Sequence, residues 1–509
     1  MARSLQLKAH SFPQISYFCP VMSIQQDNRF QAIISHAKEY GFVFPSSEIY
    51  DGLSAVYDYG PYGAELKKNI RDYWWKSMTQ MHQNIVGIDA AIFMHPTTWK
   101  ASGHVDNFSD PMIDNKDSQK RYRVDHLIEA KADQLREAGK TAEADALLAQ
   151  MDQLLAGEDF AGLKQLLADQ QIVCAVSGTG NWTDIRQFNL MFSTQLGSVA
   201  EESDTIYLRP ETAQGIFVNF LNVQKTARMK VPFGIAQIGK AFRNEIVARQ
   251  FIFRMREFEQ MEMQFFVRPG TQMEWYNYWK QERLNWHLSL GLPAEKYRYH
   301  DHVKLAHYAD AALDIEFEFP FGFKEVEGIH SRTDFDLKSH QEYSKKKQQY
   351  FDNDIDEATG KPYGNYIPYV IETSIGLDRM FLLILSHAYA EETIAKEDGT
   401  TDSRVVLRIP AKIAPNKLAI LPLVKKDGLP EIARELMDEC KGAFKCFYEE
   451  KDAIGKRYRR QDAIGTPFCV TIDHQTKEDQ TVTIRYRDSM VQERVLMSKV
   501  KDLVLEQVF

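Results

Sequence analysis

The chain contains 509 residues, of which 44% are hydrophobic and 26% are charged, and its formal net charge at pH 7 is -9. A chain of this length is expected to form roughly three domains with separate cores, and its net charge excludes a surface that is basic throughout. The five cysteines are scattered without a C-x-x-C pair, which disfavours a disulfide framework or a thiolate zinc site and indicates a reducing compartment.

The N-terminal segment, residues 1–21, lacks the apolar run and small-residue site of a secretory signal. We interpret it as a tail, and Met22 is an alternative first residue. No uninterrupted apolar run approaches the roughly 20 residues that span a bilayer, so no membrane partner is expected. The sequence therefore predicts a cytoplasmic protein.

The first predicted helix lies between Tyr62 and Met81, where apolar residues recur at helical spacing after the start signal Gly60-Pro61. A strand is predicted over 85–93. Residues 127–170 then change in composition, because Ala, Leu, Gln, Glu and Lys dominate and aromatic residues almost vanish. They predict a small helical insertion with helices over 127–138, 141–156 and 159–169, separated by Gly139 and Gly157.

Aromatic-rich strands with few helices between them follow the insertion, which predicts a largely antiparallel sheet of six or seven strands. These strands are predicted over 206–208, 233–238, 251–255, 261–267 and 315–319. From about residue 405 strands and helices alternate, which predicts a separate mixed-sheet domain. Its strands are predicted over 418–424, 445–449, 467–472 and 481–487, and its helices over 429–440, 454–463 and 497–507. The fold class is therefore α+β.

One stretch whose residues could take part in catalysis is Phe242-Arg243-Asn244-Glu245, followed after a variable loop by FRMREFEQME over 253–262. Where a protein has no P-loop, guanidinium groups can neutralise the α-phosphate of ATP and stack on its base. The run 234–240 does fit G-x-x-x-x-G-K, but Ala241 lacks the hydroxyl that a P-loop needs for its metal. For a single arginine, an ordinary hairpin with solvated charges is the alternative.

The second such stretch is the strand YIPYVIETS followed by Ile375-Gly376-Leu377-Asp378-Arg379, which opens an apolar helix. An arginine in the first turn of a helix can reach the terminal phosphates of ATP near the positive end of the helix. The alternative is a simple turn at Gly376 with a surface ion pair at Arg379.

Together, these two stretches resemble motifs 2 and 3 of class II aminoacyl-tRNA synthetases. Further stretches are similar to the glycyl-tRNA synthetase family, and the match runs from about residue 24 to 495. They are GFVFP over 41–45, YDYGP over 57–61, ASGHV over 101–105, RPETAQG over 209–215 and IGKRY over 454–458. By this resemblance the 60–96 segment is motif 1, the dimer-forming element, and the expected assembly is a homodimer.

The resemblance implies a domain division and a set of site residues. The division is 1–21 tail, 22–126 and 173–405 catalytic core, 127–172 insertion, and 406–509 anticodon-binding domain. Glycine would be bound by Arg123, Glu211, Phe258, Glu259, Gln260, Met261, Glu262, Glu372, Thr373, Ser374, Ile375 and Gly376. ATP would be bound by Arg243, Asn244, Glu245, Phe253, Arg254, Met255, Arg256, Glu257, Phe258, Glu325, Val326, Gly376, Leu377, Asp378 and Arg379. Any one glutamate could instead form a structural ion pair.

The implied reaction joins glycine and ATP into glycyl-adenylate and then transfers glycine to the 3' end of tRNA(Gly). Arg243 and Arg379 are the expected catalytic residues, with Mg²⁺ as the cofactor of ATP. No protein-only metal site is expected. Some relatives carry paired cysteines where this chain reads Asn115-Lys116-Asp117-Ser118, so no zinc is expected there. His300, His302 and His307 could suggest metal ligands, but packed histidines are commoner than ligands.

The C-terminal domain carries a basic cluster around Tyr458, and basic residues with an aromatic fit a surface for unpaired RNA. Its predicted tRNA-binding residues are Lys456, Arg457, Arg459 and Arg460. A solvated helix face is the alternative. Two other functions are open at this point: a nucleic-acid-binding accessory protein without catalysis, and an adenylate-forming ligase with a different acceptor. The sequence does not indicate which tRNA bases are read.

Overall fold

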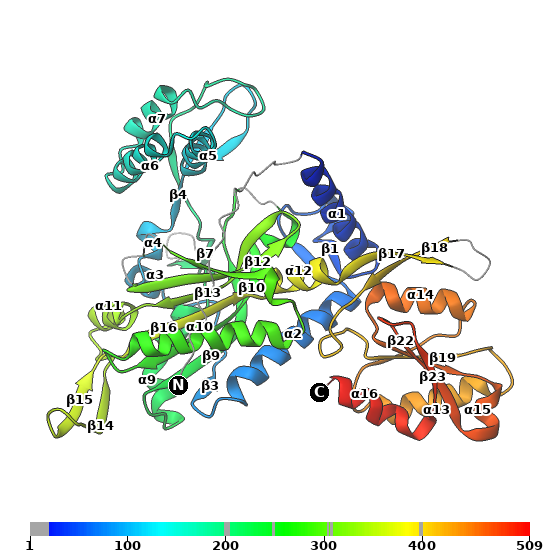
Figure 1. Ribbon diagram of the computed structural model, residues 1–509. Helices are drawn as coiled ribbons and strands as arrows, with labels where there is room; N and C mark the ends of the chain where they lie inside the picture. The colour runs from blue at the N-terminus through cyan, green and yellow to red at the C-terminus, as the bar shows by residue number, and fades with distance from the viewer. Residues whose placement is uncertain are drawn as a thin grey trace, which may run out of the picture.

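The computed structural model describes residues 20–197, 204–246, 250–302, 305, 309–395 and 401–508. Its largest element is a seven-stranded sheet in the order β11-β12-β13-β16-β10-β9-β3 (Figure 1). Neighbouring strands run antiparallel except β3 and β9, which are parallel. The strands are β3 (Ile85–Gly87), β9 (Phe233–Phe242), β10 (Glu257–Val267), β11 (Tyr297–Asp301), β12 (Ala311–Phe319), β13 (Gly322–Ser331) and β16 (Tyr369–Gly376). The predicted antiparallel core sheet is confirmed.

This sheet has an apolar and a polar face, because successive side chains of a strand point to opposite sides. On β10, Met261, Met263 and Phe265 belong to the apolar core, whereas Glu262 and Gln264 alternate with them and point to the other face. The apolar face is packed against helices α2 (Pro61–Thr79), α10 (Gln272–Ser289) and α12 (Leu377–Ala388). Function is therefore to be sought on the polar face.

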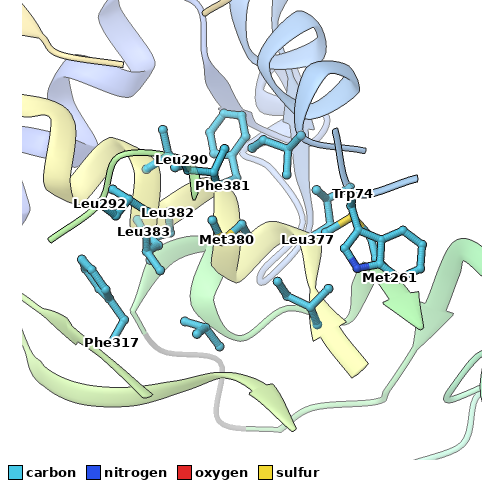
Figure 2. Packing of buried hydrophobic residues seen from close by; sticks show 14 of the residues in the cluster. Trp74, Met261, Leu290, Leu292, Phe317, Leu377, Met380, Phe381, Leu382 and Leu383 are labelled. Atoms are coloured by element: carbon cyan, nitrogen blue, oxygen red, sulfur yellow. The ribbon is translucent and has the colours of Figure 1, made fainter. Parts of the chain in front are cut away.

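Helix α12 is apolar almost throughout because it is enclosed by other elements. Figure 2 shows its side chains between Trp74 of α2 and Phe317 of β12. Met380, Phe381 and Leu383 are fully buried, and burial of each such side chain stabilises the fold by about 1.5–3 kcal/mol. This packing fixes the first turn of α12, which carries Arg379.

Smaller elements surround the sheet. The helices are α1 (Pro20–Glu39), α3 (Pro96–Ala101), α4 (His104–Asn107), α8 (Ala213–Phe217), α9 (Phe220–Thr226) and α11 (Phe335–Ser344). The strand pairs are β1 (Val43–Pro45) with β2 (Tyr57–Tyr59), β7 (Ser193–Leu196) with β8 (Asp204–Tyr207), β14 (Tyr350–Asp356) with β15 (Lys361–Tyr366), and β17 (Tyr389–Ala395) with β18 (Thr401–Leu407).

The helical insertion has its own apolar core, which includes Ile128, Leu147 and Leu163. Its helices are α5 (Val124–Glu137), α6 (Thr141–Ala156) and α7 (Phe160–Asp169), as predicted to within a few residues. They lie at the far end of a three-stranded sheet of β4 (Ser109–Asp114), β5 (Arg121–Arg123) and β6 (Arg186–Asn189) (Figure 1).

The C-terminal part contains a five-stranded sheet in the order β20-β19-β21-β22-β23 with a separate core. Its elements are β19 (Leu418–Pro422), α13 (Leu429–Cys440), β20 (Cys446–Tyr448), α14 (Ile454–Ile464), β21 (Phe468–Ile472), α15 (His474–Asp479), β22 (Thr481–Tyr486), β23 (Gln492–Leu496) and α16 (Val500–Val508). The predicted alternation is confirmed, and α15 and β23 are additions that the sequence did not predict.

One predicted strand was wrong, and another was predicted too long. Residues 251–255 begin with a 3-10 turn over Phe251–Phe253, in which Gln250 and Phe251 have positive φ angles of 66° and 58°. These apolar side chains pack under the hairpin, with the ring of Phe253 at 5.5 Å from those of Phe319 and Phe321. The apolar side chains of this segment therefore serve core packing, and the segment does not pair as a strand. The strand predicted over 85–93 ends at Gly87.

Candidate active site

A cleft with about 590 Å³ of empty space opens on the polar face, between the β9–β10 hairpin, β13 and the start of α12. It is lined by Arg243, Glu245, Ile252, Phe253, Arg254, Met255, Phe258, Glu259, Gln260, Glu325, Ser374, Gly376, Asp378 and Arg379. All of these except Ile252 were predicted from the sequence to bind glycine or ATP. The two stretches, more than 100 residues apart in the chain, thus meet in one cleft.

Arg243 directly follows β9, where its backbone N–H donates to the carbonyl of Arg256 across the hairpin at 2.9 Å. Its Nε donates to the carbonyl of Pro210 at 3.1 Å, and its guanidinium lies 5.3 Å from the ring centre of Phe258. The flat face of Phe258 and the adjacent cation form a surface suited to a nucleotide base and its phosphates.

Arg379 lies in the first turn of α12, for which Gly376 is the N-cap. Its Nη1 is 2.9 Å from a carboxylate oxygen of Glu325, and its guanidinium lies 4.5 Å from the ring centre of Phe253. Arg379, and more weakly Arg243, lowers the pKa of Glu325 against the opposing effect of burial. Arg243, which follows β9, and Arg379, on α12, therefore both act on the carboxylate of Glu325 at the cleft.

Asp378 lines the cleft, but its carboxylate is bound by groups of the fold, so its predicted contact with ATP stays a prediction. Its carboxylate accepts hydrogen bonds from Tyr59, from Lys67 at 2.7 Å and from the backbone N–H of Glu259 at 2.7 Å. Glu259 in turn pairs with Lys67 and Arg71 at 3.2 and 2.9 Å. These contacts tie α2 to β10 and α12, and they use the acceptor capacity of both carboxylates.

Three glutamates form a carboxylate cluster beside the cleft: Glu262 and Glu372, which are buried, and Glu211, which is half-buried. Glu262 accepts hydrogen bonds from Thr212 and from Gln264, which also donates to Glu372 at 2.7 Å. The register of β10 and β16 pairs Gln264 with Glu372, so these side chains share the polar face.

The cluster is held in unequal charge states. Burial raises the pKa of Glu262 well above its usual value, and the charges of Glu372 and Glu211 raise it further. Burial opposes ionisation of Glu372 as well, but Arg332 and His330 outweigh it and lower that pKa. His104 and Arg332 do the same for Glu211. The pKa shifts therefore favour the ionised form of Glu372 and Glu211 and the neutral form of Glu262, an arrangement suited to a small ammonium group.

Several predicted site residues have buried side chains that do not line the cleft, and their roles stay predictions. These are Met261, Thr373, Ile375, Val326 and Leu377, each at most 1% exposed. Arg256 donates to the carbonyls of Glu245 and Ser54 and stabilises the hairpin. Glu257 pairs with Lys240, and the backbone N–H of Asn244 donates to the carbonyl of Leu190. Contacts of the five buried residues with a ligand would have to use backbone atoms.

Arg123, predicted for the glycine pocket, is the residue before α5 at the base of the insertion. Its guanidinium pairs with Asp110 at 3.1 Å and with Asp125 at 2.6 Å. Burial opposes the charge of Arg123, but Asp125 and Asp110 raise its pKa, and Glu245 of the cleft adds a smaller effect in the same direction. In this conformation Arg123 is thus close to the hairpin and bound to aspartates. Among the described residues, it makes no direct contact with the carboxylate cluster.

Other polar residues of the cluster were missed. Arg332 bridges Glu372 and Asp336 at 2.9 Å each. Gln237 pairs with Glu262 across β9 and β10, and both ends of its buried amide lack a partner among the described residues. Strand alternation could have revealed Gln237 and Gln264, because each shares a face with a predicted glutamate. Arg332 and His104 carry no such local signal.

Comparisons with known proteins agree with this geometry. The family "tRNA synthetase class II core domain (G, H, P, S and T)" matches residues 192–388. "Anticodon binding domain" matches 417–507, and "Glycyl-tRNA synthetase insertion domain 1" matches 110–145 and 136–190. The "Glycine--tRNA ligase" of Chlorobaculum tepidum is 55% identical over 474 residues, which cover 93% of this chain and 98% of that protein. The chain belongs to the glycine--tRNA ligase family.

Two other proteins named "Glycine--tRNA ligase" have similar sequence identity to this chain. That of Treponema denticola is 51% identical over 477 residues, covering 92% of this chain and 96% of its own. That of Staphylococcus saprophyticus is 51% identical over 482 residues, covering 94% and 98%. As a family member with a class II core, the chain is an aminoacyl-tRNA synthetase, an enzyme class that attaches an amino acid to tRNA with ATP. No helix of the described part is long and apolar enough to cross a membrane.

In the anticodon-binding domain, the basic cluster is mostly satisfied internally. Arg457 is 1% exposed and donates to the carbonyls of Pro422 and Glu449 at 2.7 and 3.0 Å. The prediction that Arg457 contacts RNA is therefore wrong for this conformation. Arg460 pairs with Glu449 and Asp452, and Arg459 pairs with Asp402. Lys456 is exposed.

Around Asn115 and Ser118, four polar side chains form a hydrogen-bonded network. Ser118 Oγ lies 3.2 Å from Cys174 Sγ, and Ser177 donates to Asn115 at 2.9 Å. The expectation that no zinc binds there stays a prediction. His307 lies outside the described residues.

Proposed function

We propose that this chain activates glycine with ATP in the cleft of the polar face and then transfers the glycyl group to the 3' end of tRNA(Gly). The observation that carries the proposal is the position of the carboxylate cluster of Glu211, Glu262 and Glu372 beside a cleft that contains Arg243 and Arg379. A cation site next to an anion site suits an amino acid and ATP.

Glycine offers no side chain, so its ammonium group is the main handle for recognition. Buried carboxylates bind an ammonium strongly because water does not compete with them. Larger amino acids would be excluded by lack of space. Because glycine is the smallest amino acid, this steric exclusion needs no editing site.

The first step is attack of the glycine carboxylate on the α-phosphorus of ATP, with release of pyrophosphate. The carboxylate is already ionised, so no general base is required. Arg243 would stabilise charge that develops at the α-phosphate, and Arg379 would hold the base or the terminal phosphates. Mg²⁺ would enter with ATP and neutralise phosphate charge, and the partly exposed carboxylate of Glu325 fits such a hard cation.

We also propose the domain division given above, a homodimer and a cytoplasmic location. Exposed apolar side chains at Ile49, Tyr50 and Leu53, next to β1 and β2, support a contact with a second copy. The 3' end of tRNA would enter the cleft while the anticodon arm contacts the 406–509 domain.

Glycine-dependent exchange of pyrophosphate into ATP, measured with and without tRNA, tests the proposed function. We expect exchange without tRNA, followed by charging when tRNA(Gly) is added. An accessory RNA-binding protein would show no exchange, and a ligase with another acceptor would show exchange without charging.

A further inference from the structure

A second group of polar side chains lies on the β11 side of the carboxylate cluster. His302 follows β11, Asp314 lies on β12 and His330 lies on β13. One donor atom from each lies within 4.8 Å of the others, and His302 Nε2 is 3.0 Å from Asp314 Oδ2. We propose that these three side chains bind one divalent transition-metal ion of the zinc type, separate from the Mg²⁺ that accompanies ATP.

The strand register makes these donors converge. Asp314 pairs with Gly328, and His330 follows two residues later on the same face of β13. A Cβ atom at Gly328 would lie 3.3 Å from His330 Nε2 and 3.6 Å from Asp314 Oδ1. Both donors therefore lie next to Gly328, which has no side chain. Any larger residue at this position would occupy the space between the two donors.

His330 is also oriented as a ligand. Its Nδ1–H donates to the Glu372 carboxylate at 2.7 Å, so the neutral ring leaves the Nε2 lone pair free. A carboxylate behind a histidine is the usual support of a metal-bound imidazole, since it fixes both the tautomer and the ring orientation. Glu372 is itself held by Arg332 and Gln264.

The donor set indicates the class of metal. Two imidazoles and one carboxylate suit Zn²⁺, Co²⁺ or Ni²⁺, whereas Mg²⁺ prefers oxygen ligands. Bonds of about 2.0–2.2 Å place tetrahedral ligands about 3.3 Å apart. The His302–Asp314 distance of 3.0 Å already meets this, and His330 would approach by side-chain rotation. Since the His302 and His330 side chains are 32% and 20% exposed, water could take the open coordination position.

A metal here would act on the glycine pocket through His330 and Glu372, a consequence that rests on the proposed function. It would hold His330 in place and thereby fix the Glu372 carboxylate. We expect removal of the metal to raise the KM for glycine severalfold while the KM for ATP stays unchanged.

Metal binding itself is tested without any activity assay. The full chain, stripped with a chelator, is dialysed against micromolar Zn²⁺ in millimolar Mg²⁺, and bound zinc is counted. We expect one equivalent in the unmodified chain and at least a tenfold loss of affinity in His302→Ala and His330→Ala. His300→Ala is the matched control, because His300 contacts Glu316 and lies outside the trio. It should retain the equivalent.

His330→Asn guards against misfolding, because its amide nitrogen takes the place of Nδ1 and can still donate to Glu372, while nothing replaces Nε2 as a zinc ligand. It should lose zinc while its thermal unfolding matches that of the unmodified chain. The proposal is overturned if the unmodified chain binds no stoichiometric zinc, or if the His302 and His330 variants bind it as tightly as His300→Ala does. Either result leaves the proposed glycine activation standing.

Discussion

Arginines occupy two regions of this molecule in opposite ways. In the cleft, Arg243 donates to a backbone carbonyl, and Arg379 shares the partly exposed carboxylate of Glu325. Against the C-terminal domain, Arg404 of the adjoining strand β18 and Arg485 of β22 are buried, and both bind Asp462 at 2.8–2.9 Å. The cleft arginines thus keep hydrogen-bond donors for a ligand, whereas the arginines around Asp462 use theirs to stabilise the fold. Free hydrogen-bonding capacity, more than local charge, therefore indicates where anions bind.

The largest expected effect tests the cleft side of this comparison. Arg243→Ala should slow adenylate formation on the order of 10³-fold or more, because a preorganised donor to developing phosphate charge is lost. Single-turnover formation of glycyl-adenylate measures this, and unfolding temperature should stay unchanged. Arg459→Ala, a partly exposed arginine of the C-terminal domain, is the control and should form adenylate normally. Near-normal adenylate formation in Arg243→Ala would remove this residue from the mechanism.

The next effect tests the other side. Asp462→Ala should destabilise the C-terminal domain by about 3 kcal/mol, because Arg404 and Arg485 would remain buried without their shared carboxylate. Denaturant unfolding measures the loss. Adenylate formation by the folded fraction should persist. A variant as stable as the unmodified chain would show that this network contributes little.

The insertion offers an intermediate case, since it is neither the cleft nor the C-terminal domain. Replacing residues 127–170 by a short flexible linker should slow transfer to tRNA about tenfold, or about 1.4 kcal/mol, and adenylate formation much less. The reason is that Arg123, near the hairpin, connects the insertion to the rim of the cleft. Comparison of single-turnover rates for the two steps tests this, and equal losses in both would argue against tRNA contact.

Lys417 should make the stability of the protein depend on pH. Burial lowers the pKa of Lys417 to about 7, with Lys68 adding to the effect and Glu65 opposing it. An unfolded lysine has a pKa of about 10.4, so above pH 7 the unfolded state binds more protons. Stability should therefore rise with pH between about 7 and 10, by at most about 1.4 kcal/mol per unit. Lys417→Met should flatten this slope in unfolding measured at pH 7, 8 and 9, and an unchanged slope would contradict the assignment.

The smallest expected effect concerns Lys456, which is exposed. If it contacts a tRNA phosphate, Lys456→Ala should raise the KM for tRNA about twofold to threefold and reduce the salt dependence by about one counterion. Charging kinetics at two salt concentrations measure this. Lys501→Ala, another exposed lysine of the domain, is the matched control. Identical behaviour of the two variants would place the RNA surface elsewhere.

Strong periodic signals predicted much of the fold. Helix α13 spans Leu429–Cys440 as predicted, because its apolar spacing and its flanking glycine agree. The 251–255 segment misled because a short apolar run reads alike in a strand and in a packed turn. Most of the cleft lining was predictable, since motif resemblance carries residue positions directly.

Other parts of the site depend on contacts that no local pattern encodes. Arg332 reaches Glu372 across 40 residues, and His104 reaches Glu211 across more than 100. Arg457 looked like an RNA contact because sequence shows charge but does not show burial. Only the three-dimensional structure distinguishes an arginine whose hydrogen-bond donors are used within the fold from one whose donors are free to bind a ligand.

The central claim is that the cations of the cleft activate glycine and those of the C-terminal domain do not. Its most direct test is glycine-dependent pyrophosphate exchange without tRNA, measured in parallel on the unmodified chain, Arg379→Ala and Arg459→Ala. We predict exchange in the unmodified chain with glycine and none with alanine, loss of exchange in Arg379→Ala, and normal exchange in Arg459→Ala. Exchange that survives in Arg379→Ala, or disappears in Arg459→Ala, would contradict the claim.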